Sequence, residues 1–295
     1  MQETPLKTET INEKSSKLDK LSSKDLVELF ADDTLNVVQA LKQAKQEIAN
    51  VIDKTSQCLE QGGSLYYLGA GTSGRLGILD AVECPPTFST EANLVQGIIA
   101  GGDKAIFKAV EGAEDNEDEA YQIIKEKLTA NDALIVISAS GGAAFCIGAL
   151  KAAQEINCFH AAISNNSEAK IFKYSQEQIF LDTGAELLAG STRLKAGTAQ
   201  KVALNIISTS VMVKLGKTYS NLMVDVKVSN SKLYKRAINL VKLISNCSET
   251  EAKEALDKSN NKVKQAILYL KKGLDFEAAS EILKQNKGFL AKVLD

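Results

Sequence analysis

The feature that most constrains the fold is a series of short apolar runs, each ending in glycine or a small polar residue, with helical patterns between them. The runs occupy residues 64–69, 94–102, 133–142, 159–166 and 178–184. The helical patterns cover residues 103–112, 117–128, 143–156 and 193–215. Because buried parallel strands are joined by helical crossovers, this alternation predicts an α/β fold: a doubly wound, three-layer αβα sandwich with a parallel sheet.

The segments on either side of this alternation lack strand signals. Residues 1–20 are polar and predict an arm without a core of its own. Apolar residues at helical spacing over 23–61 predict two amphipathic helices, the first with Ser23 as its N-cap. Beyond about residue 235 only helical patterning remains, and Ser248 and Glu251 have the spacing of a capping box.

The C-terminal part also contains a weak internal echo. Residues 251–263 resemble residues 277–289 at Glu, Ala, aliphatic, Lys and Asn positions, which predicts two related helical hairpins. We therefore expect three segments: an N-terminal arm with helices that pack on the core, an α/β domain, and an all-helical C-terminal subdomain. Their boundaries are residues 1–61, 62–235 and 236–295.

Composition excludes several classes of protein. The 35 basic and 37 acidic residues leave a formal charge of −2, which argues against a nucleic-acid-binding surface. No stretch approaches the ~18 apolar residues of a membrane span, and the polar start differs from a signal peptide. The five cysteines form no C-x-x-C pair and are odd in number, which is typical of reduced thiols. We expect a cytoplasmic protein without membrane or nucleic-acid partners.

The chain has one histidine, His160, so a histidine-rich zinc site is excluded and carboxylates must carry any proton transfer. His160 stands among apolar neighbours in a predicted strand, which is more typical of a packed core residue than of a catalyst.

The clearest candidate site is the glycine-rich segment LGAGTSGRLG, residues 68–77, at the end of the first strand. Glycines allow close backbone approach to an oxyanion, while Thr72, Ser73 and the start of the next helix supply donors. The segment matches G-x-G-x-x-G but lacks a Walker Gly-Lys-Ser/Thr, and no ribose-binding carboxylate follows the next strand near Gly101. A terminal phosphate is favoured over a dinucleotide; a tight turn in which Ser73 caps the helix stays open.

A second loop, Ser138-Ala139-Ser140-Gly141-Gly142, repeats this pattern after another strand. Ligands of such sheets bind at the carboxyl ends of strands near the topological switch point, which indicates the loops that start at Gly69 and Ser138. Two such loops favour a sugar phosphate bound between them, although helix capping also explains the second loop.

Two groups of carboxylates are candidates for acid–base chemistry. Asp80 and Glu83 come after the first loop, and Glu111, Glu114 and Asp115 follow the glycines at 101–102. Prolines lack an amide donor, so we expect Pro85-Pro86 to end a helix just after Glu83. Two carboxyl groups beside a sugar can divide acid and base work.

The segment AGSTRLKAGTAQK, residues 189–201, places Arg193 and Lys195 after Ser191 and Thr192 at the start of a helix. Cations there oppose the helix dipole, which indicates an anionic ligand or an acidic partner.

Several motifs together carry a family resemblance: LGAGTSGRLGILDAVECPPTF, IIAGG with AVEGAED, GSTRLKAGTAQK, and NLMVDV. They are similar to those of the N-acetylmuramic acid 6-phosphate etherases, which belong to the sugar isomerase (SIS) domain superfamily. The resemblance covers nearly the whole chain, and its Glu-Cys-Pro-Pro-Thr block is far more specific than a glycine loop. It implies removal of D-lactate from N-acetylmuramate 6-phosphate, with no metal or organic cofactor, by a homodimer with sites near the subunit interface.

The resemblance also implies roles for residues. Opening the sugar to its aldehyde acidifies the C2 hydrogen, so that Glu114 abstracts it while Glu83 gives a proton to the leaving lactyl oxygen and later activates water. From the two loops themselves we expect Gly71, Thr72, Ser73, Ser138, Ser140 and Gly141 to bind the substrate.

One departure from the family pattern lies in the second loop. The family has Arg-Thr-Pro where this chain has Gly142-Ala143-Ala144, so a charged anion contact worth about 1.5 to 3 kcal/mol is missing. Ser138 stands where the family has alanine and offers a replacement hydroxyl. A non-catalytic sugar-phosphate-binding regulator and an aldose–ketose isomerase are the alternatives to a lyase; lactate release and product mass distinguish the three.

Overall fold

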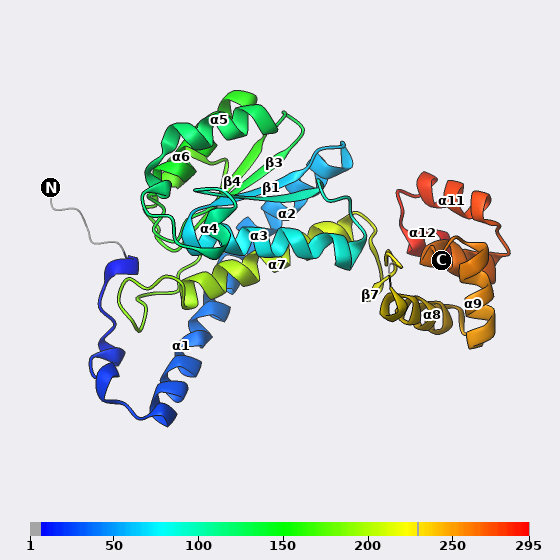
Figure 1. Ribbon diagram of the computed structural model, residues 1–295, viewed down its shortest axis with the longest axis horizontal. Coiled ribbons are helices and arrows are strands. Elements are labelled where there is room, and N and C mark those ends of the chain that lie inside the picture. Colours follow the sequence, from blue (N-terminus) through cyan, green and yellow to red (C-terminus); the bar gives the residue numbers. More distant parts are fainter. Residues whose placement is uncertain (1–6, 229, 295) are drawn as a thin grey trace. The chain divides into compact units, whose positions relative to one another are not determined.

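The computed structural model describes residues 7–228 and 230–294. The chain divides into two compact units (Figure 1). The first comprises the chain up to residue 82 together with residues 93–208, and the second comprises residues 83–92 and the chain from residue 209 onward. The segment boundaries expected at residues 61 and 235 stay a prediction.

A parallel sheet forms the centre of the first unit. Within the described residues its five strands are β1 (Leu65–Gly69), β2 (Val95–Ile99), β3 (Ala133–Ile137), β4 (Phe159–Ser164) and β5 (Glu177–Phe180). Their order is β2-β1-β3-β4-β5, and every neighbouring pair is parallel. Each predicted run thus coincides with one strand, and only β5 begins one residue before its run, at Glu177. Every residue of β1 and β3 is buried, because helices cover both faces of a doubly wound sheet.

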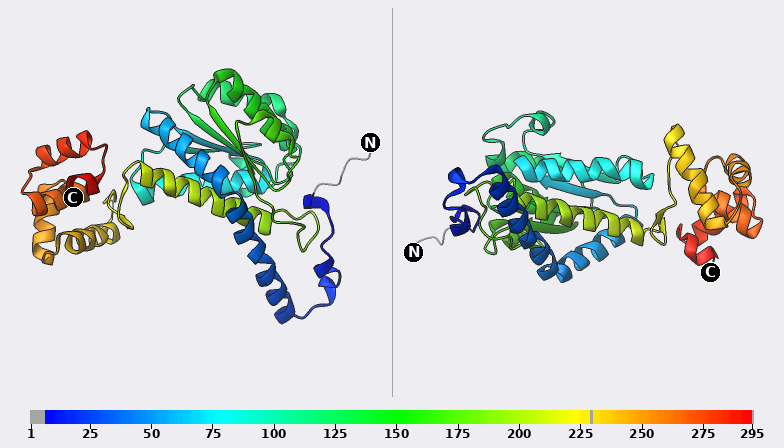
Figure 2. Two further views of the ribbon diagram at one scale, coloured as in Figure 1. Left: turned by 180° about the vertical axis from the view of Figure 1, so that it is seen from behind. Right: turned by 90° about the horizontal axis from the view of Figure 1, so that it is seen from below.

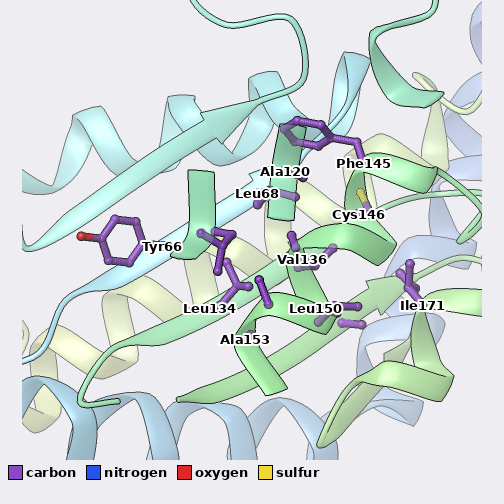
Figure 3. Packing of buried hydrophobic residues seen from close by; sticks show 14 of the residues in the cluster. Tyr66, Leu68, Ala120, Leu134, Val136, Phe145, Cys146, Leu150, Ala153 and Ile171 are labelled. Carbon is purple, nitrogen blue, oxygen red and sulfur yellow. The ribbon is translucent and has the colours of Figure 1, made fainter. Parts of the chain in front are cut away.

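Helices form the two outer layers, as Figures 1 and 2 show. One face carries α5 (Glu117–Lys127) and α6 (Ala144–Ile156); the other carries α2 (Lys45–Glu60), α3 (Gly71–Phe88) and α7 (Lys195–Lys214). This confirms the predicted three-layer αβα sandwich. The core between the sheet and α5 and α6 appears in Figure 3, where Leu68, Leu134 and Val136 of the strands meet Phe145 and Leu150 of α6.

The N-terminal region begins with three short 3-10 helices at Lys7–Glu9, Glu13–Ser15 and Leu18–Lys20, followed by α1 (Ser23–Gln43). The prediction of two amphipathic helices is confirmed by α1 and α2. The predicted N-cap is wrong by one residue: Ser22 has extended backbone angles and accepts a bond from the Asp25 amide at 3.2 Å, while Ser23 is already helical. Adjacent serines give the same sequence signal, and the backbone angles decide between them.

Two further helix predictions need correction. Helix α3 does not end at Glu83 but runs through Pro85 and Pro86 to Phe88. Proline's fixed φ is helical, and the buried side chains of Cys84 and Phe88, four residues apart, share the face that packs the last turn.

The second correction concerns residues 103–112. Only α4 (Lys104–Phe107) forms there, because Lys108 turns to extended backbone and Gly112 is left-handed at φ 73°. Ala105 is the buried residue of α4, whereas the side chain of Phe107 is 87% exposed, so this segment buries too small an apolar face to hold a longer helix.

Besides the ends of α3 and α7, the second unit contains a two-stranded ribbon and helices. The ribbon pairs β6 (Thr218–Tyr219) with β7 (Leu222–Met223), and the helices are α8 (Ser231–Ser245), α9 (Glu249–Lys258), α10 (Val263–Lys272), α11 (Phe276–Gln285) and α12 (Leu290–Leu294).

Local chemistry in this unit agrees with the sequence. The capping box is confirmed: the Ser248 hydroxyl accepts from the Glu251 amide, and the Glu251 carboxylate accepts from the Ser248 amide. The two related hairpins are confirmed by α9–α10 and α11–α12. Both first helices end alike, with an amide that donates five residues back, from Asn261 to Leu256 and from Gly288 to Leu283.

Candidate active site

The two glycine loops follow neighbouring strands. Gly69, the last residue of β1, pairs in register with Ile137, the last residue of β3. The strand order reverses between β1 and β3, so both loops begin at the topological switch point. The structure thus brings the two predicted loops to one edge of the sheet.

The first loop is a tight strand-to-helix turn. Gly71 starts α3 and has a left-handed φ of 53°. A Cβ on Gly74 would lie 2.5 Å from the Gly69 carbonyl oxygen, so this close approach requires glycine. The amides at the start of the 18-residue helix α3 are therefore available beside Gly71.

Ser73 lies in a buried network of polar side chains. Its hydroxyl donates to Gln200 Oε1 at 2.8 Å, and Gln200 Nε2 donates to Asn165 Oδ1 at 2.9 Å. Asn165 Nδ2 in turn donates to the Leu181 carbonyl and the Thr183 hydroxyl. This network fixes the first loop to α7 and to the ends of β4 and β5. The sequence did not predict roles for Gln200 and Asn165, because nothing in a single sequence indicates that residues so far apart along the chain are in contact.

A cavity of about 250 Å³ opens beside the first loop. Gly71 and Arg75 line it from the start of α3, and Glu111 and Glu114 line it from the segment after α4. The structure therefore brings the first loop and one of the two predicted catalytic glutamates together.

Arg75 also lines this cavity; it lies within the glycine-rich motif, but the motif alone does not mark it as a site residue. Its guanidinium donates to the Ile106 carbonyl at 3.1 Å and to the Lys108 carbonyl at 3.3 Å. These bonds hold the C-terminal end of α4 against α3, so Arg75 supplies a fixed positive charge in a cavity that Glu111 and Glu114 also line.

Cys146 shows how close Glu114 lies to the start of α6. The thiol is fully buried, and its pKa is raised to about 12: burial is the main cause and the charge of Glu114 adds to it, while a hydrogen bond with the Ala70 backbone opposes the shift. Glu114 and Ala70 of the first loop therefore both lie near the first turn of α6, which begins just after the second loop.

Glu83 lies elsewhere on α3. Among the described residues that line the cavity Glu83 is absent, and its side chain is exposed. It follows Gly71 in the same continuous helix after about 18 Å of helical rise.

The second loop is held by its own hydroxyls. Ser138 is buried and accepts a bond from the Gly141 amide at 3.1 Å, and Ser140 accepts one from the Gly142 amide at 3.4 Å. Gly141 has a left-handed φ of 72°, and a Cβ there would lie 2.2 Å from Ala169 Cβ. At Gly142, in contrast, a Cβ would meet no heavy atom of the described residues within 4 Å.

The cation at the start of α7 has its partner within the chain. Lys195 Nζ donates to both carboxylate oxygens of Asp33, at 2.8 and 2.9 Å, and to the Ala185 carbonyl. The Glu186 carboxylate accepts from the amides of Lys195 and Ala196, and burial raises its pKa. The acidic partner predicted for this segment is thus Asp33 of α1. This pair lines a larger cavity of about 550 Å³, to which neither glycine loop contributes in the described part of the chain.

His160 is a core residue, as predicted. It is 2% exposed, its Nδ1 lies 2.9 Å from the Cys158 carbonyl, and burial lowers its pKa. Across residues 7–228 and 230–294 no group of three or more potential metal ligands gathers. Within the same ranges no helix combines the length and apolar character needed to span a membrane.

Comparison with known families identifies two regions. Residues 47–154 match the glucokinase regulatory protein N-terminal SIS domain, and residues 220–272 match the C-terminal lid domain of glucokinase regulatory protein.

Relatives match over nearly the full length. An N-acetylmuramic acid 6-phosphate etherase from Francisella philomiragia is 48% identical over 97% of this chain and 97% of its own. Another from Clostridioides difficile is 43% identical over 98% of this chain and 95% of its own.

Solved structures share the fold. A phosphoheptose isomerase from Francisella tularensis superposes with a TM-score of 0.51 at 16% identity, covering 65% of this chain and 98% of its own. A putative sugar-phosphate isomerase from Listeria monocytogenes gives 0.52 at 14% identity, covering 67% and 94%.

Proposed function

The chain belongs to the family of N-acetylmuramic acid 6-phosphate etherases, and on this premise we propose which of its residues perform the reaction. These enzymes are carbon–oxygen lyases. The reaction splits the lactyl ether of N-acetylmuramic acid 6-phosphate with water and yields N-acetylglucosamine 6-phosphate and D-lactate. The observation that carries the assignment is that Gly71 and Glu114 line one cavity beside the switch point of the sheet.

The two glycine loops bind the sugar phosphate in this proposal. Gly71, Thr72 and Ser73 place the amide end of α3 against the phosphate, where the helix dipole favours negative charge. Ser138, Ser140 and Gly141 contact the sugar from the neighbouring strand end. Arg75 adds a fixed positive charge on the same side.

Glu114 serves as the base at C2. In the open-chain sugar the C1 aldehyde acidifies the C2 hydrogen, and the Glu114 carboxylate takes this proton as the C2–C3 double bond forms. The C3–O bond breaks, and Glu83, protonated at this step, gives its proton to the departing lactyl oxygen. Water then adds to C3: the Glu83 carboxylate removes its proton, oxygen bonds to C3, and Glu114 returns a proton to C2. Every proton removed is returned, so no cofactor is needed.

Glu83 reaches the substrate from a second copy of the chain in this proposal. Glu83 shares one exposed face of α3 with Leu79 and Val82, which are 47% and 58% exposed. Ile206 on the neighbouring helix α7 is 37% exposed. Apolar side chains of this size on adjacent helices support a protein interface. A homodimer formed through this face places Glu83 of one protomer at the cavity of its partner.

Mixing two inactive variants tests this arrangement. Glu83→Ala and Glu114→Ala homodimers are each expected to release no lactate. After co-expression, about half of the dimers combine both variants and each has one intact site, so about a quarter of wild-type activity returns. Activity that stays at the level of the separate variants contradicts a shared site. A Glu83→Ala homodimer with the wild-type rate contradicts the role of Glu83 itself.

The reaction is tested with the wild-type protein and N-acetylmuramic acid 6-phosphate. We expect D-lactate and N-acetylglucosamine 6-phosphate in equal amounts. A product of unchanged mass would indicate an isomerase, and tight binding by calorimetry without lactate would indicate a sugar-phosphate-binding regulator.

The proposal also places the enzyme in the cytoplasm. Cys146 and Cys158 are buried free thiols, which is usual for proteins in a reducing compartment. Cell fractionation with an antibody against the protein tests this location.

A further inference from the structure

The N-terminal arm is anchored at the second glycine loop through one buried residue. Thr8 is 2% exposed, whereas Lys7 and Glu9 on either side are exposed. The Thr8 amide donates to Asn166 Oδ1 at 3.4 Å, and Asn166 Nδ2 lies 3.3 Å from the Thr8 hydroxyl oxygen. Asn166 itself follows β4 and is 3% exposed. Thr8 and Asn166, far apart in the sequence, thus contact each other through both the oxygen and the nitrogen of the Asn166 side-chain amide.

Asn166 also holds the backbone of the second loop. Its Nδ2 donates to the Ser140 carbonyl at 3.0 Å and to the Ala139 carbonyl at 3.3 Å. The Asn166 amide donates to Ser164 Oγ, and Ser164 Oγ donates to the same Ala139 carbonyl at 3.2 Å. The Ala139 carbonyl also accepts from the Asn165 amide at 3.1 Å, whereas the bond to the Ser140 carbonyl comes from the Asn166 side chain. Groups at the end of the neighbouring strand therefore fix both loop carbonyls.

Fixing these carbonyls sets the direction of the loop amides. A trans peptide is planar, so the N–H of a residue points opposite to the preceding carbonyl. Because the Ala139 and Ser140 carbonyls face Asn166, the amides of Ser140 and Gly141 point away from it. The Gly141 amide donates to Ser138 Oγ, while the Ser140 amide is directed to the opposite side of the loop.

The second loop needs such support because its glycines leave its backbone with many accessible conformations. Gly141 and Gly142 are followed by Ala143 and Ala144, where the etherase pattern has a rigid proline at the last position. An unsupported glycine loop must be ordered when the ligand binds, and that ordering lowers affinity.

We propose that Asn166 and Thr8 are positioning residues that hold the second loop ready for the sugar phosphate. This inference rests on the proposed function, because it takes the second loop as part of the substrate site. The arm thereby contributes to substrate affinity without touching the reacting atoms.

The test measures lactate release and the affinity for N-acetylglucosamine 6-phosphate, the latter by calorimetry. Thr8→Val keeps the shape of the side chain and removes its hydroxyl, and Asn166→Ala removes the whole contact. We expect KM and the calorimetric Kd to rise about threefold for Thr8→Val, which loses one contact between the arm and Asn166. For Asn166→Ala, which loses both side-chain bonds to the loop carbonyls as well as the contacts with Thr8, we expect a rise of about tenfold. In both variants kcat should stay within about twofold. Thr8→Ser, which restores the hydroxyl, should recover the wild-type KM.

Thr10→Val is the matched control, since the Thr10 hydroxyl donates to Lys7 within the arm. It should leave KM and Kd unchanged. The inference is overturned if Thr8→Val binds the sugar phosphate like the wild type, if Thr10→Val weakens binding equally, or if Thr8→Val lowers only the melting temperature. Thr8→Val also decides the matter if Asn166→Ala does not fold. A wild-type protein that releases no lactate would instead refute the proposed function, and the calorimetric comparison would still test the two residues.

Discussion

Replacing Ala143 with threonine is expected to stabilise the protein by supplying a missing helix cap. Ala143 is the N-cap of the 13-residue helix α6, with φ −57° and ψ 124°, and its methyl group cannot accept a hydrogen bond. A threonine hydroxyl at this position can accept from the amide of Phe145 or Cys146. Alanine in place of threonine at an N-cap costs about 1 kcal/mol.

The full effect should appear in global unfolding. Phe145, Cys146, Ala149 and Leu150 of α6 belong to the core cluster shown in Figure 3, so the helix cannot melt while that core remains packed. A gain of about 1 kcal/mol corresponds to a rise of about 3 °C in Tm. Adding Ala144→Pro should contribute about 0.5 kcal/mol more, because the first helical position tolerates proline and Ala143 already has the extended ψ that a following proline requires.

Differential scanning calorimetry of Ala143→Thr and Ala143→Val measures this contribution. Valine has the shape of threonine without the hydroxyl, so the difference between the two melting temperatures isolates the hydrogen bond. Equal melting temperatures would refute the assignment of Ala143 as an uncapped N-cap. A lower Tm for both variants would mean that the loop has no room for a branched side chain.

The other expectations concern affinity, pH and the second unit. An arginine in Gly142→Arg has open space around its Cβ and should lower KM for the sugar phosphate about tenfold. An unchanged KM in steady-state assays would argue against an anion near this position. Because burial lowers the pKa of His160 in the folded state, the unfolded chain binds a proton more readily. The free energy of unfolding should therefore fall as the pH drops below about 6.5. The midpoint of urea unfolding should lose this dependence on pH in His160→Gln. Lys264 Nζ donates to the Asp225 carboxylate at 2.7 Å and to two carbonyls, so Lys264→Met should lower the free energy of unfolding of the second unit by about 3 kcal/mol in urea titrations. Lys217→Met, whose amine lies 3.6 Å from the same carboxylate, should cost less than about 1 kcal/mol. Equal losses for the two variants would contradict the role of burial.

The fold was predictable because its signals are local. Each apolar run is short, buried and followed by a turn residue, so five runs predict five strands, and the right-handed crossover places their ends at one edge. Helix ends were less predictable. Ser22 and Ser23 have the same cap chemistry, and the prolines at 85 and 86 stay helical because Cys84 and Phe88 are buried on one face.

The site was predictable to a smaller extent. Gly71 and Glu114 line one cavity, as loops that follow adjacent strands should. Arg75 stood inside the glycine motif, but only the structure shows that it lines the same cavity and binds the carbonyls of Ile106 and Lys108. Gln200 and Asn166 act through contacts between segments far apart in the chain, and single-sequence periodicity contains no information about such pairs.

The buried hydrogen bonds from Ser73 through Gln200 to Asn165 restrict how this protein can evolve. Any one of these side chains, once replaced, leaves its neighbour with an unmet polar group in the interior. Descendant sequences should therefore retain all three side chains or replace them together. Substitutions in the first loop should then be accompanied by substitutions at positions remote from it along the chain.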